Sequence, residues 1–337
     1  MTAVTSRKRR LYPRRAAIAQ YLDRVVATRI NPCDSLVVSG FARSGTTWLQ
    51  QSVATILHAK TVFEPLHFQA PAAQQIHADL NLSDKSVHVR ELCMPYCREP
   101  TLREGALLDV FRDSLRGATP GRAPRVLRAG VAESLRARIV VKCVRAHLCL
   151  RAAQNTFSMP VVHIYRDPRA VIASVRMTDW AWLYDHLSLR EQLLDIGDGR
   201  ADYFGQWRDA ILEYDRHDAV TRIAAYWALT EKCLTESYQD GGKLNSTGFI
   251  SFLSFEQLCA QPDVALAPVF AALGVAPSSS QASAALRKDS QTTSKTRMGT
   301  SLEDRVTGWS KLLTPAEIKT IESIATRFGF EDRLAGR

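Results

Sequence analysis

Apolar runs rich in β-branched residues alternate along the chain with helical patterns, which predicts an α/β fold. Four of these runs have the character of fully buried strands, and they cover residues 35–40, 137–144, 160–167 and 248–255. Strands that are apolar on both faces are typical of parallel sheets covered by helices. We therefore expect a single domain with a central parallel sheet flanked by helices and with one inserted helical segment.

Several helices are marked by the residues at their ends. Asp167 is expected to cap a helix that begins with proline, and Thr314, Pro315 and Glu317 have the pattern of a capping box. A further helix is expected over 217–237, because its apolar residues share one face. These residues are Val220, Ile223, Ala224, Trp227 and Leu234.

Local composition divides the chain into a tail and one domain. Residues 1–30 form a basic lead-in that we expect to be partly disordered, and 31–337 form the domain. Within the domain, 178–216 is rich in aromatic and acidic residues, which is compatible with a helical lid or insertion and equally with ordinary packing helices. The Ser/Thr-rich stretch 276–301 lacks a period and predicts a long loop.

Charge and hydropathy exclude some classes of protein. Of the net charge of +10, six positive charges come from the first 16 residues, so the domain is mildly basic and does not predict a specific nucleic-acid interface. The tail could be an organelle address, a nuclear-type signal, a contact for polyanions or a solvated lead-in. No apolar run is long enough for a membrane span, so we expect a soluble protein, and the cysteines, interpreted below as reduced, predict that it is cytoplasmic.

The seven cysteines are scattered, and Cys93 and Cys97 are the only close pair. Without a second cluster at ligand spacing, a structural zinc site is not expected, nor any other metal. We interpret the thiols as mostly buried and reduced, with a Cys93–Cys97 disulfide as the alternative.

The stretch Gly40–Thr47 reads "GFARSGTT" between a predicted buried strand and a predicted helix. It nearly matches the nucleotide-binding pattern G-x-x-x-x-G-K-[ST], but Thr46 stands in place of the lysine and Arg43 precedes the second glycine. Backbone N–H groups and the helix dipole at such a turn attract anions, and the hydroxyl and guanidinium groups here add donors. The loop therefore predicts a site for a phosphate-like oxyanion.

The segment "FARSGTTWL" resembles the 5′-phosphosulfate-binding loop of the sulfotransferases that use PAPS (3′-phosphoadenosine 5′-phosphosulfate). In that family a Lys or Arg stands before Ser-Gly-Thr-Thr/Ser. The resemblance implies a loop that holds a phosphosulfate without a metal ion, because Arg43 carries charge that a metal would otherwise supply. The donor contacts that it implies are Arg43, Ser44, Gly45, Thr46, Thr47 and Trp48.

A second family element, which binds the 3′-phosphate, is a strand that ends in Arg and is followed eight residues later by Ser. "VVHIYRDPRAVIASV" resembles it, with Arg166 and Ser174 in these places. Taken alone, Arg166 beside Asp167 indicates only a local cap and ion pair. Because the two elements occur in the right order, each after a strand, we expect them to hold opposite ends of one nucleotide.

Further matches extend the resemblance over most of the chain and favour the carbohydrate-type branch of the family over the cytosolic aryl and steroid branch. They include "FEPLHF" (63–68), "VVKCVR" (140–145) and the closing segment around 276–308, which is expected to cover the cofactor. In that segment Arg297 and Arg305 are both candidate phosphate contacts, and the choice between them stays open.

Sulfuryl transfer needs charge neutralisation at the leaving oxygen and a general base. The resemblance gives the first role to Arg43, Thr46 and Thr47, with Lys142 as a second cation or a lysine that reaches solvent. The histidine of the cytosolic "KTH" segment is missing from the matching "KCV". Glu64 is therefore the preferred base, with a pKa expected to be raised by partial desolvation, and His67 and His147 are the alternatives.

The resemblance implies an enzyme that moves a sulfuryl group from PAPS to a hydroxyl or amine and releases adenosine 3′,5′-bisphosphate. The acceptor is expected to be a small molecule or carbohydrate, and the protein a monomer or homodimer. One alternative is an ATP- or GTP-dependent kinase, which the missing lysine disfavours. Another is a non-catalytic nucleotide- or polyanion-binding protein.

Overall fold

A computed structural model describes residues 25–118, 136–239, 249–276, 285 and 301–334. Five strands form one sheet in the order β2-β3-β1-β4-β5, and all neighbours are parallel. The strands are β1 (Leu36–Ser39), β2 (Lys60–Phe63), β3 (Ile139–Cys143), β4 (Val161–Tyr165) and β5 (Ile250–Ser254). The predicted α/β class with a parallel sheet is confirmed.

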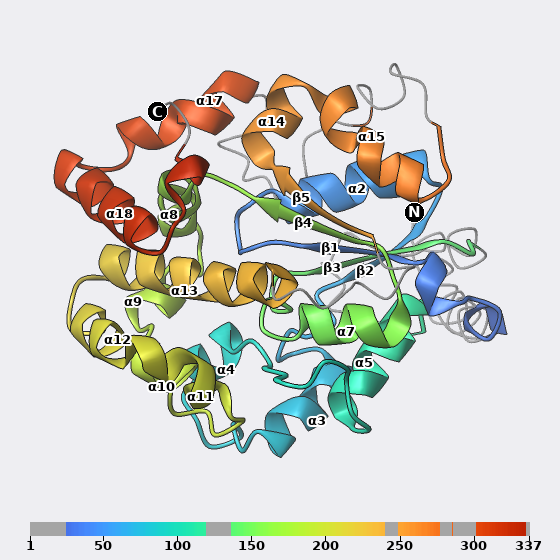
Figure 1. Cartoon of the computed structure of the whole chain (residues 1–337), viewed down its shortest axis with the longest axis horizontal. Helices are drawn as coiled ribbons and strands as arrows, with labels where there is room; N and C mark the ends of the chain where they lie inside the picture. The colour runs from blue at the N-terminus through green and yellow to red at the C-terminus, as the bar shows by residue number, and fades with distance from the viewer. Residues whose placement is uncertain (1–24, 119–135, 240–248, 277–284, 286–300, 335–337) are drawn as a thin grey trace, which may run out of the picture.

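Helices cover both faces of the sheet (Figure 1). On one face lie α2 (Thr46–Ile56), α14 (Phe255–Ala260) and α15 (Pro262–Ala272), whose apolar residues form one core with β1, β4 and β5. The other face carries α5 (Ala106–Leu115) and α7 (Leu150–Phe157), which form a second core with β2 and β3. The near-continuous burial of β1, β3 and β4 follows from this double covering.

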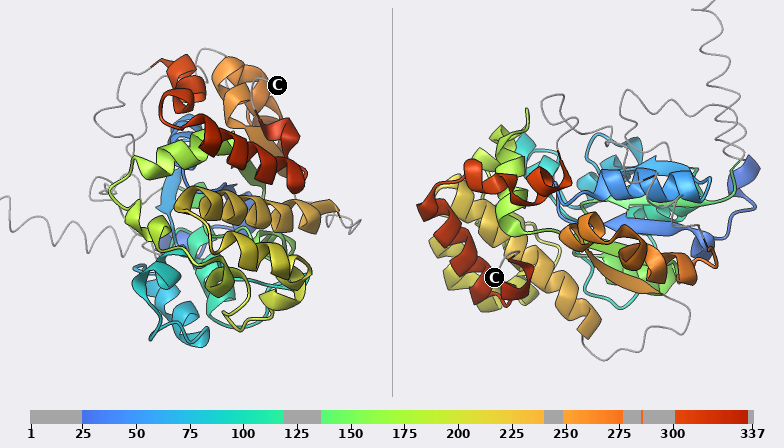
Figure 2. Two further views of the ribbon diagram at one scale, coloured as in Figure 1. Left: turned by 90° about the vertical axis from the view of Figure 1, so that its left-hand side faces the viewer. Right: turned by 90° about the horizontal axis from the view of Figure 1, so that it is seen from above.

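A helical region stands beside the sheet, as the two views of Figure 2 show. The third apolar core of the protein lies in this region and is built around α13 (Ala219–Gln239), α8 (Pro168–Arg176) and α18 (Pro315–Arg327). Shorter elements complete the described chain. They are η1 (Pro32–Asp34), α3 (Pro71–Asp79), α4 (Val87–Leu92), α9 (Trp182–Asp185), α10 (Leu189–Leu193), α11 (Arg200–Phe204), η2 (Gly205–Trp207), α12 (Arg208–Tyr214), α17 (Leu302–Thr307), η4 (Gly308–Lys311) and η5 (Glu331–Arg333).

The predicted helix ends agree with the structure. The Asp167 carboxylate accepts the Arg169 N–H at the start of α8, and Thr314 and Glu317 form the reciprocal capping box of α18. All five apolar residues predicted for one face of α13 are buried. One strand, β2, was not predicted from the sequence.

Other predictions meet the structure only in part. The segment 178–216 is indeed helical, and it contains α9 to α12. All seven cysteines are free, so the alternative of a Cys93–Cys97 disulfide is wrong. Most of the tail and of the 276–308 segment lies outside the described residues. Among the helices that the structure describes, none combines the length and apolarity required to cross a bilayer.

Candidate active site

The loop between β1 and α2 has a backbone that requires glycine at two positions. A Cβ added at Gly40 would stand 2.3 Å from the carbonyl oxygen of Ile164, and one at Gly45 would stand 2.6 Å from Cδ2 of Phe255. Gly45 also has φ +92°, and Arg43 has φ +72°, which is uncommon for a residue with a side chain. The loop is thus packed closely against β4 and α14 in one fixed conformation.

The N-terminus of α2 opens toward a cavity. Gly45, the N-cap residue, provides no side-chain hydrogen bond to the first turn, so no capping side chain competes with a ligand for the N–H groups at this helix start. Thr46 and Thr47 line the same cavity, whereas Ser44 is fully buried behind the loop and its hydroxyl is without a hydrogen-bond partner among the described residues. This end of the helix is suited to an anion.

The second predicted element meets the first in one cavity of about 820 Å³. Arg43 Nε donates to Ser174 Oγ at 3.0 Å, and an Arg166 guanidinium nitrogen donates to the Arg43 carbonyl oxygen at 3.1 Å. Arg166 also donates to the Arg305 carbonyl oxygen and lies 4.4 Å from the ring centre of Phe255. Two predicted anion-binding elements separated by more than 120 residues therefore face a common space.

Glu64 stands between three donors at the carboxyl ends of β2 and β3. Its Oε1 lies 2.6 Å from Lys142 Nζ and its Oε2 lies 3.3 Å from an Arg145 nitrogen, and the Val144 N–H points at both oxygens. Burial opposes ionisation, but Lys142, Arg145 and these hydrogen bonds outweigh it, so the pKa of Glu64 is lowered. The expectation of a raised pKa is wrong, because it took account of desolvation without the two cations.

The two histidines proposed as alternative bases have different surroundings. His67 lines the cavity, where its Nε2 lies 3.1 Å from Glu91 and its Nδ1 accepts the Gln69 N–H at 3.1 Å. His147 does not line the cavity, and its Nε2 lies 3.1 Å from Glu231 inside the protein. His147 is therefore wrongly placed to act as a base in this site.

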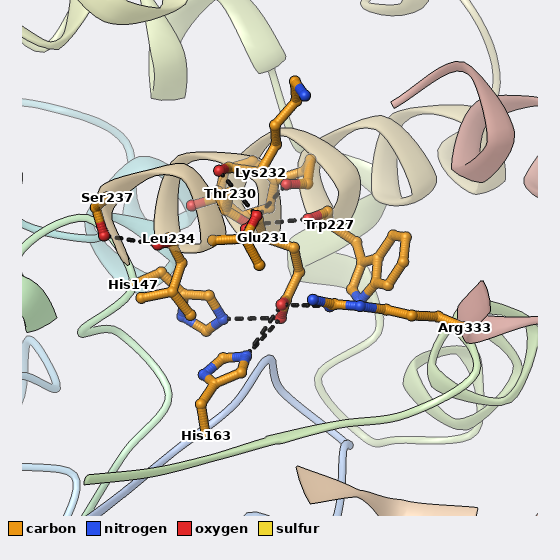
Figure 3. A network of polar contacts seen from close by, with 11 residues as sticks. His147, His163, Trp227, Thr230, Glu231, Lys232, Leu234, Ser237 and Arg333 are labelled. Atoms are coloured by element: carbon orange, nitrogen blue, oxygen red, sulfur yellow. Dashed lines mark hydrogen bonds and ion pairs between the residues drawn. The ribbon is translucent and has the colours of Figure 1, made fainter. Parts of the chain in front are cut away.

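His147 belongs to a buried network centred on Glu231 (Figure 3). His163 of β4 and Arg333 of η5 reach the same carboxylate, at 3.0 and 2.6 Å. Burial lowers the pKa of His163, although Glu231 opposes this, while His163 and Arg333 outweigh burial and hold the pKa of Glu231 well below its ordinary value. The ligand atoms of the two histidines and Glu231 lie within 4.8 Å of one another, but Arg333 already balances the carboxylate charge.

Most predicted site residues line the cavity. They are Arg43, Gly45, Thr46, Thr47, Trp48, Glu64, His67, Lys142, Arg166, Ser174 and Arg305. Arg297 lies outside the described residues. Sequence reasoning missed Arg145, Glu91 and Tyr184, which also line the cavity. Arg145 could have been found, because it follows the carboxyl end of a predicted strand, where ligands of parallel sheets bind.

The comparison with family models matches residues 33–305 to the sulfotransferase domain. The chain belongs to the sulfotransferase family. This confirms the resemblance and the expected class of enzyme, and it favours sulfuryl transfer over the kinase and non-catalytic alternatives. The comparison with curated protein sequences gave no match to this sulfotransferase.

Solved structures similar to this sulfotransferase share little sequence with it. The sulfotransferase domain from the curacin biosynthetic pathway is 12% identical, with coverage of 88% of this chain and 97% of that one and a TM-score of 0.43. Sulfotransferase STF1 from Mycobacterium tuberculosis H37Rv is 16% identical, with coverage of 91% and 87% and a TM-score of 0.40. Mouse sulfotransferase SULT7A1, complexed with PAP, is 13% identical, with coverage of 87% and 83% and a TM-score of 0.40.

Proposed function

We propose that this enzyme transfers a sulfuryl group from PAPS to a hydroxyl or amine of an acceptor and releases adenosine 3′,5′-bisphosphate. The observation that carries the proposal is the meeting of two anion-binding elements in one cavity. The loop Gly40–Thr47 would hold the 5′-phosphosulfate, while Arg166 and Ser174 would hold the 3′-phosphate. Arg305, whose carbonyl oxygen accepts a hydrogen bond from Arg166, also lines the cavity and supplies a further cation.

The cations that line the cavity support transfer without a metal ion. Arg43 and the N-terminus of α2 would stabilise the negative charge that develops on the leaving phosphate oxygen. Lys142 lines the same cavity, and its ammonium group also lies 4.2 Å from the ring centre of Phe63, which holds the side chain in place. Among the described residues, these groups are the candidates for charge neutralisation.

The pair formed by Glu64 and Lys142 would couple proton transfer to stabilisation of the leaving group. When Glu64 takes the acceptor proton, its charge is lost, and the attraction that held Lys142 at 2.6 Å weakens. Lys142 is then released to interact with the oxygen that leaves. The lowered pKa makes Glu64 a weak base at equilibrium. The new interaction between Lys142 and the leaving oxygen nevertheless favours protonation of Glu64 during transfer.

Calorimetry with adenosine 3′,5′-bisphosphate, ATP–Mg²⁺ and heparin tests the proposal. We expect tight binding of the bisphosphate without metal, and an affinity reduced at least tenfold in Arg166→Ala, because a charge-assisted contact to phosphate is lost. Arg98→Ala, which alters an exposed arginine paired with Asp202, is the matched control and should bind normally. Preference for ATP–Mg²⁺, or bisphosphate binding unaffected by Arg166→Ala, would overturn the assignment.

A further inference from the structure

One group of the residues that line the cavity is predominantly apolar. It is built by Leu92 and Met94 at and after the end of α4, by Leu183 and Tyr184 of α9, and by Trp180, which precedes α9. The Trp180 and Tyr184 rings lie 5.9 Å apart, and the elements belong to the helical core, so the surface is part of a packed structure. We call these five residues the apolar wall.

The wall has two polar side-chain groups, the Trp180 indole N–H, which can only donate, and the Tyr184 hydroxyl, which can donate and accept. The Tyr184 side chain is only 3% exposed, and its hydroxyl makes no hydrogen bond to any described residue. The hydroxyl oxygen is nevertheless not fully enclosed by protein atoms, and Tyr184 lines the cavity. The hydroxyl is therefore accessible to a ligand in the cavity. Burial raises the pKa of the Tyr184 phenol, although Arg145 and Arg43 oppose this, so the group remains a neutral donor and acceptor.

Tyr184 lines the same cavity as the groups assigned to the reaction. Arg145, Arg43 and Glu64 are the charged groups whose fields reach its hydroxyl. Arg145 joins α4 to this centre, because it donates from Nε to the Glu91 carbonyl oxygen and from a terminal nitrogen to Glu64. Because Glu91 precedes Leu92 in α4, Arg145 connects the candidate base to the helix that carries part of the apolar wall.

The charged groups around Glu64 already balance one another. Lys142 and Arg145 are paired with Glu64, and Arg145 also lies 3.7 Å from Glu91. The carboxylates of Glu64 and Glu91 therefore balance the charges of Lys142 and Arg145. Neither cation is left unbalanced to attract an anionic acceptor. No asparagine or glutamine occurs among the described residues that line the cavity, although such amides are suited to the several hydroxyls of a sugar.

We propose that the apolar wall is the acceptor subsite, that it takes an uncharged alcohol or phenol with an apolar body, and that Tyr184 hydrogen-bonds the hydroxyl that is sulfated. This inference rests on the proposed function and narrows its acceptor to one chemical class. In the reaction, the acceptor O–H bond breaks and its proton goes to Glu64 as the oxygen bonds to sulfur. The bond between sulfur and the phosphate oxygen breaks, and its electron pair stays with the released bisphosphate.

Acceptor competition with radiolabelled PAPS tests the inference. The panel contains 2-naphthol and 1-hexanol as apolar acceptors, N-acetylglucosamine as a neutral sugar and glucuronate as an anionic one. We expect kcat/KM for 2-naphthol to exceed that for both sugars by at least tenfold, because only the apolar acceptors bury their surface against the wall. Sulfation of a sugar with equal or greater efficiency would overturn the inference.

Tyr184→Phe removes the hydroxyl alone, and Tyr214→Phe, at a tyrosine that hydrogen-bonds Arg327, is the matched control. We expect a roughly three- to tenfold loss in kcat/KM for 2-naphthol in Tyr184→Phe, with unchanged affinity for adenosine 3′,5′-bisphosphate. Unchanged kinetics would overturn the role of Tyr184. Bisphosphate binding without sulfation of either apolar acceptor would overturn the subsite, whereas absence of bisphosphate binding would overturn the proposed function itself.

Discussion

Replacement of Arg333 by methionine should destabilise the protein strongly, because it leaves a buried carboxylate without its cation. Arg333 lies 2.6 Å from Glu231, and the two side chains are 5% and 0% exposed. The Arg333 guanidinium also lies 4.5 Å from the ring centre of Tyr165 and 4.3 Å from that of Phe330, and the thioether of methionine is suited to pack near such rings. The variant therefore removes the charge and keeps an unbranched side chain in its place.

The expected loss is about 3–5 kcal/mol in the free energy of unfolding at pH 8, which is typical when one partner of a buried ion pair is removed. His163 makes this loss depend on pH. In the native protein burial and Arg333 help to keep the pKa of His163 below 6.5, so this group destabilises the fold as pH falls below that value. Without Arg333 we expect the pKa of His163 to rise, because one of the charges that lower it is gone, so the variant loses less stability than the native protein as pH falls.

The difference between Arg333→Met and the native protein should consequently shrink between pH 8 and pH 5.5, by about 1.4 kcal/mol for each unit that the His163 pKa rises. Urea unfolding followed by tryptophan fluorescence measures it, and the buried Trp227 beside Arg333 is a local reporter. Arg190→Met, at an exposed ion pair, should change stability by less than about 1 kcal/mol. A loss below about 1 kcal/mol at pH 8, or a difference that grows toward low pH, would refute the reasoning.

Three other substitutions test separate parts of the site and fold. Gly45→Ala places a Cβ against Phe255 at a position with φ +92°, so calorimetry should show bisphosphate affinity reduced at least tenfold, and normal affinity would contradict the account of the loop. Glu64→Gln should lower turnover roughly 100-fold with little change in bisphosphate affinity, and normal turnover would exclude Glu64 as the base. Thr314→Ala should lower the free energy of unfolding by about 1 kcal/mol through loss of the α18 cap, without effect on transfer; an unchanged urea midpoint would argue against the cap.

Local signals in the sequence predicted the elements that position the donor. The strands β1, β3 and β4 are largely apolar and buried on both faces; Gly40 and Arg166 directly follow β1 and β4, and Lys142 lies near the end of β3. β2 escaped prediction because its four residues alternate between buried and half-buried and begin close after α2. A short strand of this kind owes its structure to pairing with β3, which no local pattern records.

The environments of the candidate bases could not be predicted from local sequence. Arg145, whose charge helps to lower the pKa of Glu64, stands 81 residues away along the chain. Glu231, which holds His147 in the interior, is 84 residues from that histidine and lies on α13, whereas His147 lies in the turn between β3 and α7. In both cases the sequence identifies an ionisable group, but tertiary contacts decide its protonation and direction.

The position of Arg166 has a consequence for the kinetics of nucleotide capture. Its guanidinium is held in advance by two main-chain oxygens and by the face of Phe255, so a long side chain that usually samples many rotamers has already been ordered during folding. An arriving phosphate would therefore meet an aimed guanidinium and would not have to immobilise it. Loosening the Phe255 ring should weaken capture even though phenylalanine carries no charge of its own.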